Sequence, residues 1–314
     1  MPGLLDRSLL FVTGKGGVGK TTVAAALAEL AVQQGKRTLV CEMDAKGALA
    51  TAFDVGGLEF EPTEVRPDLF AMAMNTEDSL REYLRLFVRI PFVGRIGPLA
   101  RTFDFVADAA PGVKEILAVG KLCYEVRERH YDLVVVDAEA SGHIVAQIGA
   151  PNAIRELVQV GLVRDQTDWM IDILTDPLRT GLVVVTTPEE MPVTETIELL
   201  DRVEAETKVE IAAVVANRVL PALFSEREAE VFAALATGEP QLALRTATSR
   251  QVATVFDAAE LAEARWRIGS GHLARLRQAL DAALPMLLVP ELFTKAVGRR
   301  VVMQVAESLS AELD

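Results

Sequence analysis

Short apolar runs recur along the chain, and most of them are rich in β-branched residues. They are Ser8–Val12, Arg37–Cys41, Leu69–Met74, Leu133–Val136, Leu182–Thr186, Ile211–Val215 and Met286–Val289. Runs of this length that are apolar on both faces predict strands buried in a parallel sheet. Helix-like stretches separate most of them, among them residues 20–35, Val193–Ala205 and Gly298–Leu313. Strands and helices in alternation predict an α/β fold with a doubly wound, mainly parallel sheet.

The connection after the third run is too long for a simple crossover between strands. Residues 75–130 show a mostly helical pattern broken by Pro and Gly, and residues 151–177 form a second helical stretch after the fourth run. We expect a single domain over residues 1–314 with a helical insertion subdomain in these two stretches. Extra cover for the core and a movable part that contacts a client are both open interpretations, because long connections are often functional.

A glycine-rich loop joins the first predicted strand to the first predicted helix. It consists of Gly14, Lys15, Gly16, Gly17, Val18, Gly19, Lys20, Thr21 and Thr22. Glycines let the backbone curl so that several N–H groups point at phosphate oxygens, and the following helix adds the positive end of its dipole. Lys20 is suited to neutralise the β- and γ-phosphates, and the Thr21 hydroxyl to bind Mg²⁺. The loop therefore predicts a P-loop site for ATP and Mg²⁺.

Polar residues follow the other predicted strands, at the edge where ligands of parallel sheets bind. Asp137 ends an apolar run, a position from which a carboxylate holds Mg²⁺ directly or through water. Asp44 follows the second strand and is placed to orient or activate an attacking water. Gly142 can bring an N–H close to the γ-phosphate, and the Asn217 amide suits the adenine edge. The predicted Mg²⁺ ligands are Thr21, Asp44 and Asp137.

Composition narrows the class of partner. The chain has 32 Lys and Arg against 45 Asp and Glu, a net charge of -13, which disfavours nucleic acid and anionic lipid as partners. Cys41 and Cys123 are its two cysteines and form no Cys-x-x-Cys pair, which disfavours a zinc clamp and favours a reducing compartment. The first apolar run is typical of a strand rather than a signal peptide, and no run approaches the ~20 apolar residues of a membrane span. We expect a cytoplasmic protein without direct membrane insertion.

With these residues in view, the chain resembles the ArsA family of ATPases, and most closely its bacterial, actinobacterial anion-transporting ATPase-like members. Its loop matches the family sequence GKGGVGKTT outright. Residues 44–53 and 137–143 are similar to the two switch segments of the family, and residues 111–115 match its Pro-Gly-x-x-Glu signature. Pro188 and Glu189 with Glu195 and Thr196 match a later signature. Asn217 matches the adenine-side asparagine, and the segment at Pro290 and Glu291 is similar to the adenine loop.

The resemblance implies an ATPase that works as a homodimer or as a paired heterodimer with a homologous ATPase, with two ATP at the interface. It also implies an ATP-driven closing motion that remakes a surface on the helical subdomains for a protein client. Lys15 is the additional lysine of the deviant Walker A loop, which implies that it reaches across the interface to stabilise charge on the partner's nucleotide. Lys15, Lys20 and Asp44 are therefore the predicted catalytic residues.

Both switch segments depart from the family pattern. Ala-Lys-Gly stands at residues 45–47, where Pro-Ala-His is usual, and Ala-Glu-Ala-Ser at residues 138–141, where Thr-Ala-Pro-Thr is usual. An ATP-binding subunit with weak turnover of its own, paired with a homologue that hydrolyses ATP, is therefore one alternative. The family's arsenite-binding cysteine trio is not recognisable, so the sequence does not support arsenite as a ligand.

Two other ATPase classes share the deviant loop. Positioning ATPases of the MinD and ParA type need an amphipathic membrane helix or a basic face for DNA, whereas the last helix of this chain ends in acidic residues. Cluster-bridged redox ATPases like the nitrogenase iron protein need two cysteines near a dimer axis, whereas Cys41 falls inside a predicted strand. Both classes remain alternatives of lower rank.

Overall fold

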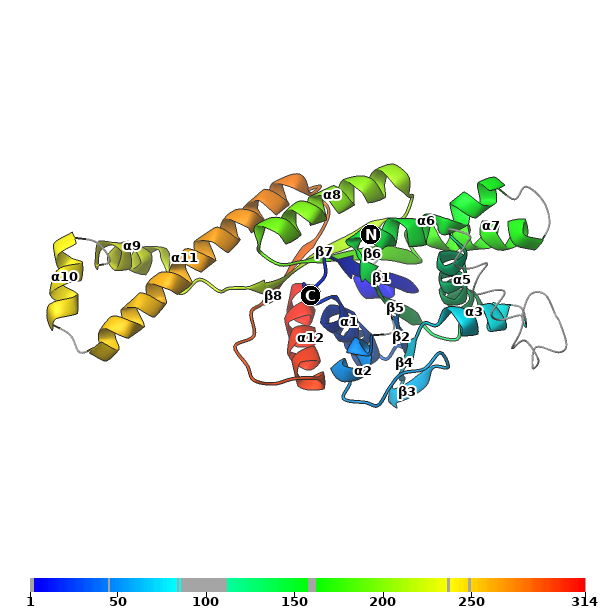
Figure 1. The fold of residues 1–314 in the computed structure, drawn as a ribbon, viewed down its shortest axis with the longest axis horizontal. Helices are drawn as coiled ribbons and strands as arrows, with labels where there is room; N and C mark the ends of the chain where they lie inside the picture. The colour runs from blue at the N-terminus through cyan, green and yellow to red at the C-terminus, as the bar shows by residue number, and fades with distance from the viewer. Residues whose placement is uncertain are drawn as a thin grey trace.

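A single sheet organises the chain, and the computed structural model describes residues 3–44, 46–83, 85, 112–157, 162–235, 238–247 and 250–313. Within these residues the sheet has eight strands in the order β3-β4-β2-β5-β1-β6-β7-β8, with helices on both faces (Figure 1). Every neighbouring pair is parallel except β3 with β4. The predicted doubly wound, mainly parallel α/β fold is confirmed.

Each of the seven predicted runs lies in a strand. The seven strands are β1 (Leu9–Gly14), β2 (Thr38–Glu42), β4 (Leu69–Ala73), β5 (Leu133–Ala140), β6 (Thr180–Thr186), β7 (Ile211–Val219) and β8 (Met286–Pro290). The eighth strand, β3 (Thr63–Arg66), was not predicted. It is an antiparallel edge strand whose four residues are exposed or half-buried, so it carries no apolar run that a pattern could detect.

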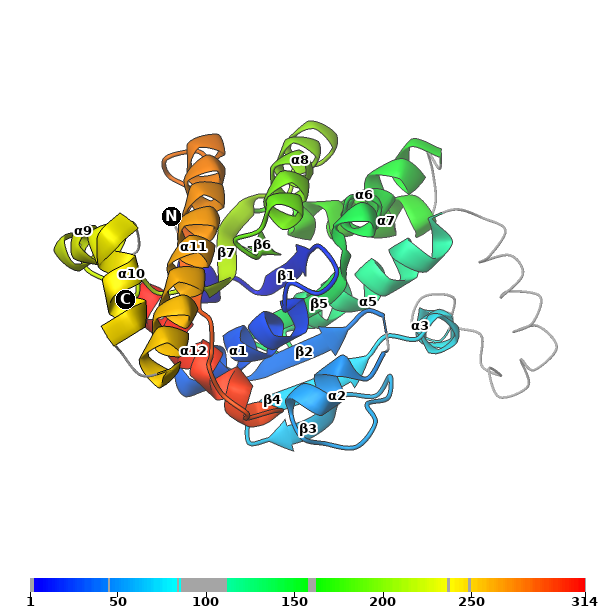
Figure 2. The same ribbon diagram turned by 60° about the vertical axis from the view of Figure 1, so that its left-hand side comes forward.

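Helices cover the two faces of the sheet and close two separate apolar cores (Figure 2). One face carries α1 (Lys20–Gln33), α2 (Ala48–Ala52) and α12 (Arg299–Leu313). The other face carries α5 (Val113–Glu128), α6 (Ser141–Leu157), α7 (Leu162–Leu174) and α8 (Glu190–Glu206). The central strands are therefore buried on both sides, which is why their sequences are continuous apolar runs.

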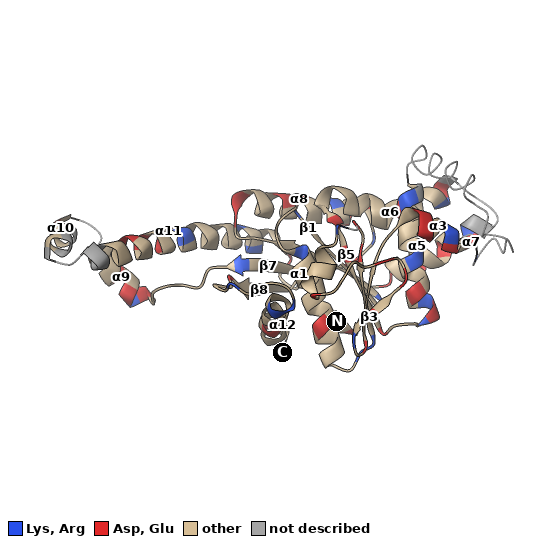
Figure 3. Ribbon diagram, turned by 60° about the horizontal axis from the view of Figure 1, so that its bottom comes forward, with Lys and Arg blue, Asp and Glu red and all other residues tan. Residues whose placement is uncertain are grey.

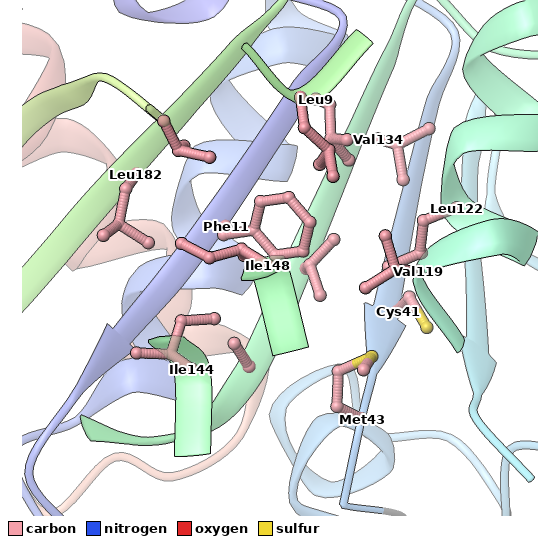
Figure 4. Close-up of a cluster of buried hydrophobic side chains, with 14 of the residues drawn as sticks. Leu9, Phe11, Cys41, Met43, Val119, Leu122, Val134, Ile144, Ile148 and Leu182 are labelled. Carbon is pink, nitrogen blue, oxygen red and sulfur yellow. The ribbon is translucent and has the colours of Figure 1, made fainter. Parts of the chain in front are cut away.

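Successive side chains of β1 enter opposite cores, as the pleat of a strand requires. Leu9 and Phe11 pack with Val134 and Leu182 under α5 and α6 (Figure 4), whereas Leu10 packs on the α1 side. All of these side chains have no exposed surface. The middle of the sheet is thus a rigid base for the residues at the ends of its strands.

The two stretches in which the sequence predicts a helical insertion contain α3 (Thr76–Tyr83), all of α5 and α7, and the end of α6. Lys121 of α5 forms an ion pair with Glu82 of α3 at 2.8 Å, and Tyr83 Oη donates to Gln166 Oε1 of α7 at 2.6 Å. Residues 84 and 86–111, which include the start of the predicted Pro-Gly signature, lie outside the described residues. The separate role of this part of the chain stays a prediction.

Three helices project beyond the sheet as an arm that the sequence pattern did not predict (Figure 1). The arm consists of α9 (Glu226–Leu235), α10 (Gly238–Ala247) and α11 (Arg250–Ala279). The ring of Phe232 stacks on those of Phe224 and Phe256 at centroid distances of 4.6 and 4.7 Å, which joins α9 to α11. Basic and acidic residues are interspersed along α11 (Figure 3), and its inner half packs against α8.

Neither the helices nor the cysteines of the described chain point to a membrane span or a surface metal cluster. Among the described residues, no helix has both the length and the apolar composition that crossing a bilayer requires. Cys41 on β2 and Cys123 on α5 are free and fully buried, and burial raises the pKa of the Cys123 thiol to about 12. Buried neutral thiols do not suit a cluster shared between two subunits.

Glu29 is a fully buried carboxylate on α1 that joins three elements. Arg66 of β3 donates to its Oε2 atom, and Arg299 Nε at the start of α12 lies 3.2 Å from its Oε1 atom. A charge without exposed surface is stable only when it is paired. This ion-pair triad therefore holds the edge strand and the last helix against the central helix.

We expect Arg66→Ala to lower the free energy of unfolding by about 2 kcal/mol, because Glu29 then keeps only one of its two cationic partners. Arg300→Ala is the matched control, since Arg300 is exposed one residue beyond Arg299. Urea unfolding followed by circular dichroism measures both variants. Equal unfolding midpoints for the two would contradict the role of the triad.

Candidate functional site

Two glycines give the phosphate loop its path from β1 into α1. Gly14 ends β1 with φ +147°, and a Cβ atom there would lie 2.1 Å from the carbonyl oxygen of Val185 on β6. Gly19 has φ +95°, and a Cβ atom there would lie 2.4 Å from Nδ2 of Asn217 on β7. Only glycine tolerates both the backbone angle and the close approach at these positions. The neighbouring strands therefore bend the loop over the carboxyl end of the sheet.

The middle of the loop faces open space. Gly16 and Gly17 are exposed, and apart from their chain neighbours no atom of the described residues lies within 4 Å of a Cβ added at either. The Val23 amide donates to Gly19 O at 3.1 Å and so makes the first hydrogen bond of α1. The amides of residues 20–22 precede it and have no acceptor within the helix. This arrangement is suited to binding an anion at the positive end of the α1 dipole.

Asp137 on β5 contacts the first turn of α1. Thr21 Oγ1 donates to Asp137 Oδ2 at 2.6 Å, whereas Asp137 Oδ1 is buried and has no hydrogen-bond partner among the described residues. Burial raises the pKa of Asp137 to about 6, against the opposing effects of the Thr21 hydrogen bond and the charge of Lys20. Burial also lowers the pKa of Lys20, whose Nζ lies 3.4 Å from Lys15 O. The end of the loop therefore lies against a buried carboxylate on β5, one of whose oxygens has no hydrogen-bond partner among the described residues.

Glu42 is a second buried carboxylate beside Asp137, and it is not among the site residues predicted from the sequence. It is 3% exposed and lies opposite Asp137 in the β2–β5 register. Its Oε1 accepts from the Ala48 amide at 2.9 Å, whereas its Oε2 meets no hydrogen-bond partner in the described part of the chain. Its position at the end of β2 could have identified it, but Asp44 stands at the more exposed position two residues later.

Asp44 forms an exposed ion pair with Lys46. The hydrogen bond to Asp44 and the charge of Asp44 raise the pKa of Lys46. The charge of Lys46 acts to lower the pKa of Lys20, and the charge of Asp44 acts to raise it. The structure thus brings Asp44 near Lys20, on the solvent side of the site. Lys46 stands in the segment where the switch sequence departs from the family pattern.

Lys15 is held by its own chain. Its Nζ lies 2.5 Å from Glu195 Oε1 on α8, and both side chains are about one-third exposed. The strand β6 ends at Thr186, and α8 begins shortly afterwards at Glu190. Glu195 matches a family signature in the sequence, but no sequence pattern indicates that it is the partner of Lys15.

Gly142 lies in the first turn of α6. It is exposed, and an added Cβ would meet no atom within 4 Å. The preceding switch residues are held to β1, since Thr13 Oγ1 donates to Glu139 O at 2.9 Å. Amides in the first turn of a helix lack helical acceptors, so the Gly142 N–H is open to a ligand.

Asn217 lies against the phosphate loop. Its Nδ2 donates to Val18 O at 2.8 Å, and its Oδ1 accepts from the Arg218 amide at 3.0 Å. Pro290 ends β8, and Glu291 is fastened to β7 by its amide, which donates to Val219 O at 2.9 Å. Asn217 therefore positions the loop, and its contact with adenine stays a prediction.

The residues present fit a nucleoside triphosphate with Mg²⁺. A hard cation prefers oxygen ligands, and the Thr21 hydroxyl and the unpartnered Asp137 Oδ1 offer two of them side by side. The buried carboxylates of Asp137 and Glu42 are stable only with positive charge nearby, and Lys20 supplies part of this charge. The open glycine loop and the first amides of α1 supply donors for phosphate oxygens.

Comparison with known proteins identifies the family of the chain. The family model of the anion-transporting ATPases, ArsA, matches residues 7–166 and 159–243. The ATPase BagA of Mycobacterium tuberculosis is 31% identical over 225 residues, which are 68% of this chain and 66% of that protein. The arsenical pump-driving ATPase of Acidiphilium multivorum is 27% identical over 241 residues, 70% of this chain and 41% of that protein. An ATPase ASNA1 homolog of Entamoeba dispar is 24% identical over 253 residues, 68% of this chain and 76% of that protein.

The matches favour the ArsA family over the other ATPase classes that share the deviant loop. The family model spans the phosphate loop, both switch segments and β7, whereas the chain spans just under two thirds of the length of its mycobacterial relative. The resemblance to the ArsA family is confirmed and ranks above that to the positioning ATPases. The chain belongs to the family of anion-transporting ATPases.

Proposed function

We propose that the protein is an Mg²⁺-dependent ATPase that converts ATP and water into ADP and phosphate. The contact between Thr21 and Asp137 carries the proposal, because it leaves Asp137 Oδ1 unpartnered at the foot of an open glycine loop. The names of the relatives, which are ATPases of the same family, support the same activity.

Each residue of the site has a role in this proposal. Lys20 and the amides of residues 16–22 would hold the β- and γ-phosphates, and Thr21 and Asp137 would hold the metal ion. Mg²⁺, when bound, supplies positive charge that offsets the charge of the phosphates. Asp44 would accept a hydrogen bond from the attacking water, and the Gly142 amide would donate to the γ-phosphate.

We further propose that two subunits form the active state, as a homodimer or as a pair with a homologous ATPase in the cytoplasm. Lys15 supports this, because Lys20 already occupies the position that an ordinary cradle needs. The pair with Glu195 holds Lys15 within its own chain, so the lysine must leave Glu195 to reach a second nucleotide. This exchange of partners makes the dimer a nucleotide-driven switch, coupled to a protein client.

We expect Lys15→Ala to lower ATP turnover about a thousandfold, since charge supplied across an interface contributes on this scale to phosphoryl transfer. MgADP affinity, measured by calorimetry, should stay unchanged because Lys20 remains. Phosphate release at several protein concentrations measures turnover and its dependence on dimer formation. Lys208→Ala, at an exposed lysine beside the opposite ends of the strands, is the control. Unchanged turnover in Lys15→Ala would contradict the two-subunit site.

We expect Asp137→Asn to raise the Mg²⁺ concentration for half-maximal ATP turnover about tenfold or more, because the variant keeps the shape of the side chain but loses its charge. Asp201→Asn, at an exposed position on α8, is the matched control. A magnesium titration of turnover compares the three proteins. The same half-maximal concentration in all of them would exclude Asp137 from the metal site.

An ATP-binding subunit with weak turnover of its own is a second candidate, and the pair between Asp44 and Lys46 favours it. A carboxylate that is paired with an ammonium group is a poorer acceptor for the proton of water. We expect Lys46→Ala to raise turnover about tenfold, a small part of what a positioned base contributes. If turnover stays undetectable in this variant while MgADP binds, a paired homologue must supply the hydrolysis.

A further inference from the structure

A pocket of about 460 Å³ lies between the carboxyl ends of β6, β7 and β8 and the inner half of α11. Its strand-end wall includes Pro188, Glu189, Arg218 and Glu291, and its helix wall includes Trp266. The volume lies in the range that sites for small molecules occupy, and the lining combines charged groups with an aromatic ring. Nothing in the roles assigned above uses the residues of α11.

One face of α11 forms the helix wall. Arg265 and Trp266 are adjacent, Gly269 follows them by four and three residues, and Leu273 follows Gly269 by four, so all four line the pocket together. At Gly269 the helix comes so close to the segment after β6 that an added Cβ would lie 3.3 Å from Pro188 Cβ. The absence of a side chain at this position therefore seats α11 directly on the end of the sheet.

The pocket adjoins the phosphate loop. Asn217 holds the loop at Val18, and the next residue, Arg218, lines the pocket. Arg218 has φ +59°, a left-handed conformation that is uncommon for a residue other than glycine and is often found at functional sites. The pocket therefore begins one residue after Asn217, which holds the loop. A nucleotide whose phosphates bind the loop has this pocket beside it.

We propose that Trp266 and Arg265 of α11 bind the purine nucleoside end of ATP, so that nucleotide occupancy fixes the arm against the sheet. The proposal rests on the proposed ATPase function and adds residues that lie outside the strand-end motifs. The indole and guanidinium planes suit stacking on a purine, and the Glu189 and Glu291 carboxylates can accept from its exocyclic amine. Because Phe232 stacks on Phe256, a fixed α11 also fixes α9.

The two tryptophans of the chain make the proposal measurable. Trp169 lies on α7, with Arg127 over its ring at 4.9 Å, so Trp169→Phe leaves Trp266 as the only tryptophan. In this variant we expect MgADP to change the Trp266 emission in a saturable manner. Magnesium tripolyphosphate, which occupies the loop without a nucleoside, should bind in calorimetry and leave the emission unchanged.

Substitution of Trp266 tests the contribution of α11 to affinity. We expect Trp266→Ala to weaken MgADP binding about tenfold, within the range that loss of a base–aromatic stack produces, and to leave tripolyphosphate binding unchanged. Trp266→Phe should restore most of the affinity. Val255→Ala, at a 69% exposed position on the outer half of α11, is the matched control.

Hydrogen exchange separates a role in binding from a role in fixing the arm. We expect saturating MgADP to slow amide exchange in the inner half of α11 and in α9 of the unsubstituted protein, and tripolyphosphate to leave it unchanged. If MgADP binds but neither Trp266→Ala nor the exchange rates respond, the proposal for α11 is wrong and the ATPase proposal stands. If neither MgADP nor tripolyphosphate binds, both proposals are wrong.

Discussion

Asp137 occupies the point where the central strands meet the phosphate loop, and the geometry of the site follows from its burial. Its strand pairs with both β1 and β2, which places the carboxylate opposite Val12 and opposite Glu42. The Thr21 hydroxyl fastens it to the start of α1, and burial raises its pKa to about 6. Two buried carboxylates with one free oxygen each are unfavourable without nearby positive charge. The fold therefore favours the binding of cations next to the loop, whose amides can donate to phosphate oxygens.

Local pattern predicted most of the sheet because its central strands are buried on both faces. Continuous apolar runs such as Leu133–Val136 leave little choice of structure, and the rule that parallel strands end at one edge then brings Asp137 and Asn217 to the loop. The same reasoning fails at β3, whose residues are exposed or half-buried, and at the arm, where apolar residues such as Val255 and Leu261 face solvent, so the apolar pattern there does not indicate a buried face.

Contacts between distant residues account for what the sequence could not predict at the site. Glu195 is 180 residues from Lys15, and Asn217 is 199 residues from Val18, so no spacing along the chain indicates either pair. Glu42 was missed for a different reason, although its place at the end of β2 made it a candidate. Its value as a site residue depends on the register that sets it beside Asp137, and register is a property of the assembled sheet.

The segment after β6 connects the two ends of the nucleotide site. Pro188 supports α11 at Gly269, beside the pocket, and seven residues later Glu195 holds Lys15 at the phosphate loop. Both contacts depend on where α8 begins, since Glu190 is its first residue. The same short segment, from Pro188 to Glu195, therefore contacts both Lys15 and α11. A change that separates Lys15 from Glu195 and a change that moves α11 both act on it. Contiguous packing of this kind can couple Lys15 to the arm without any further moving part.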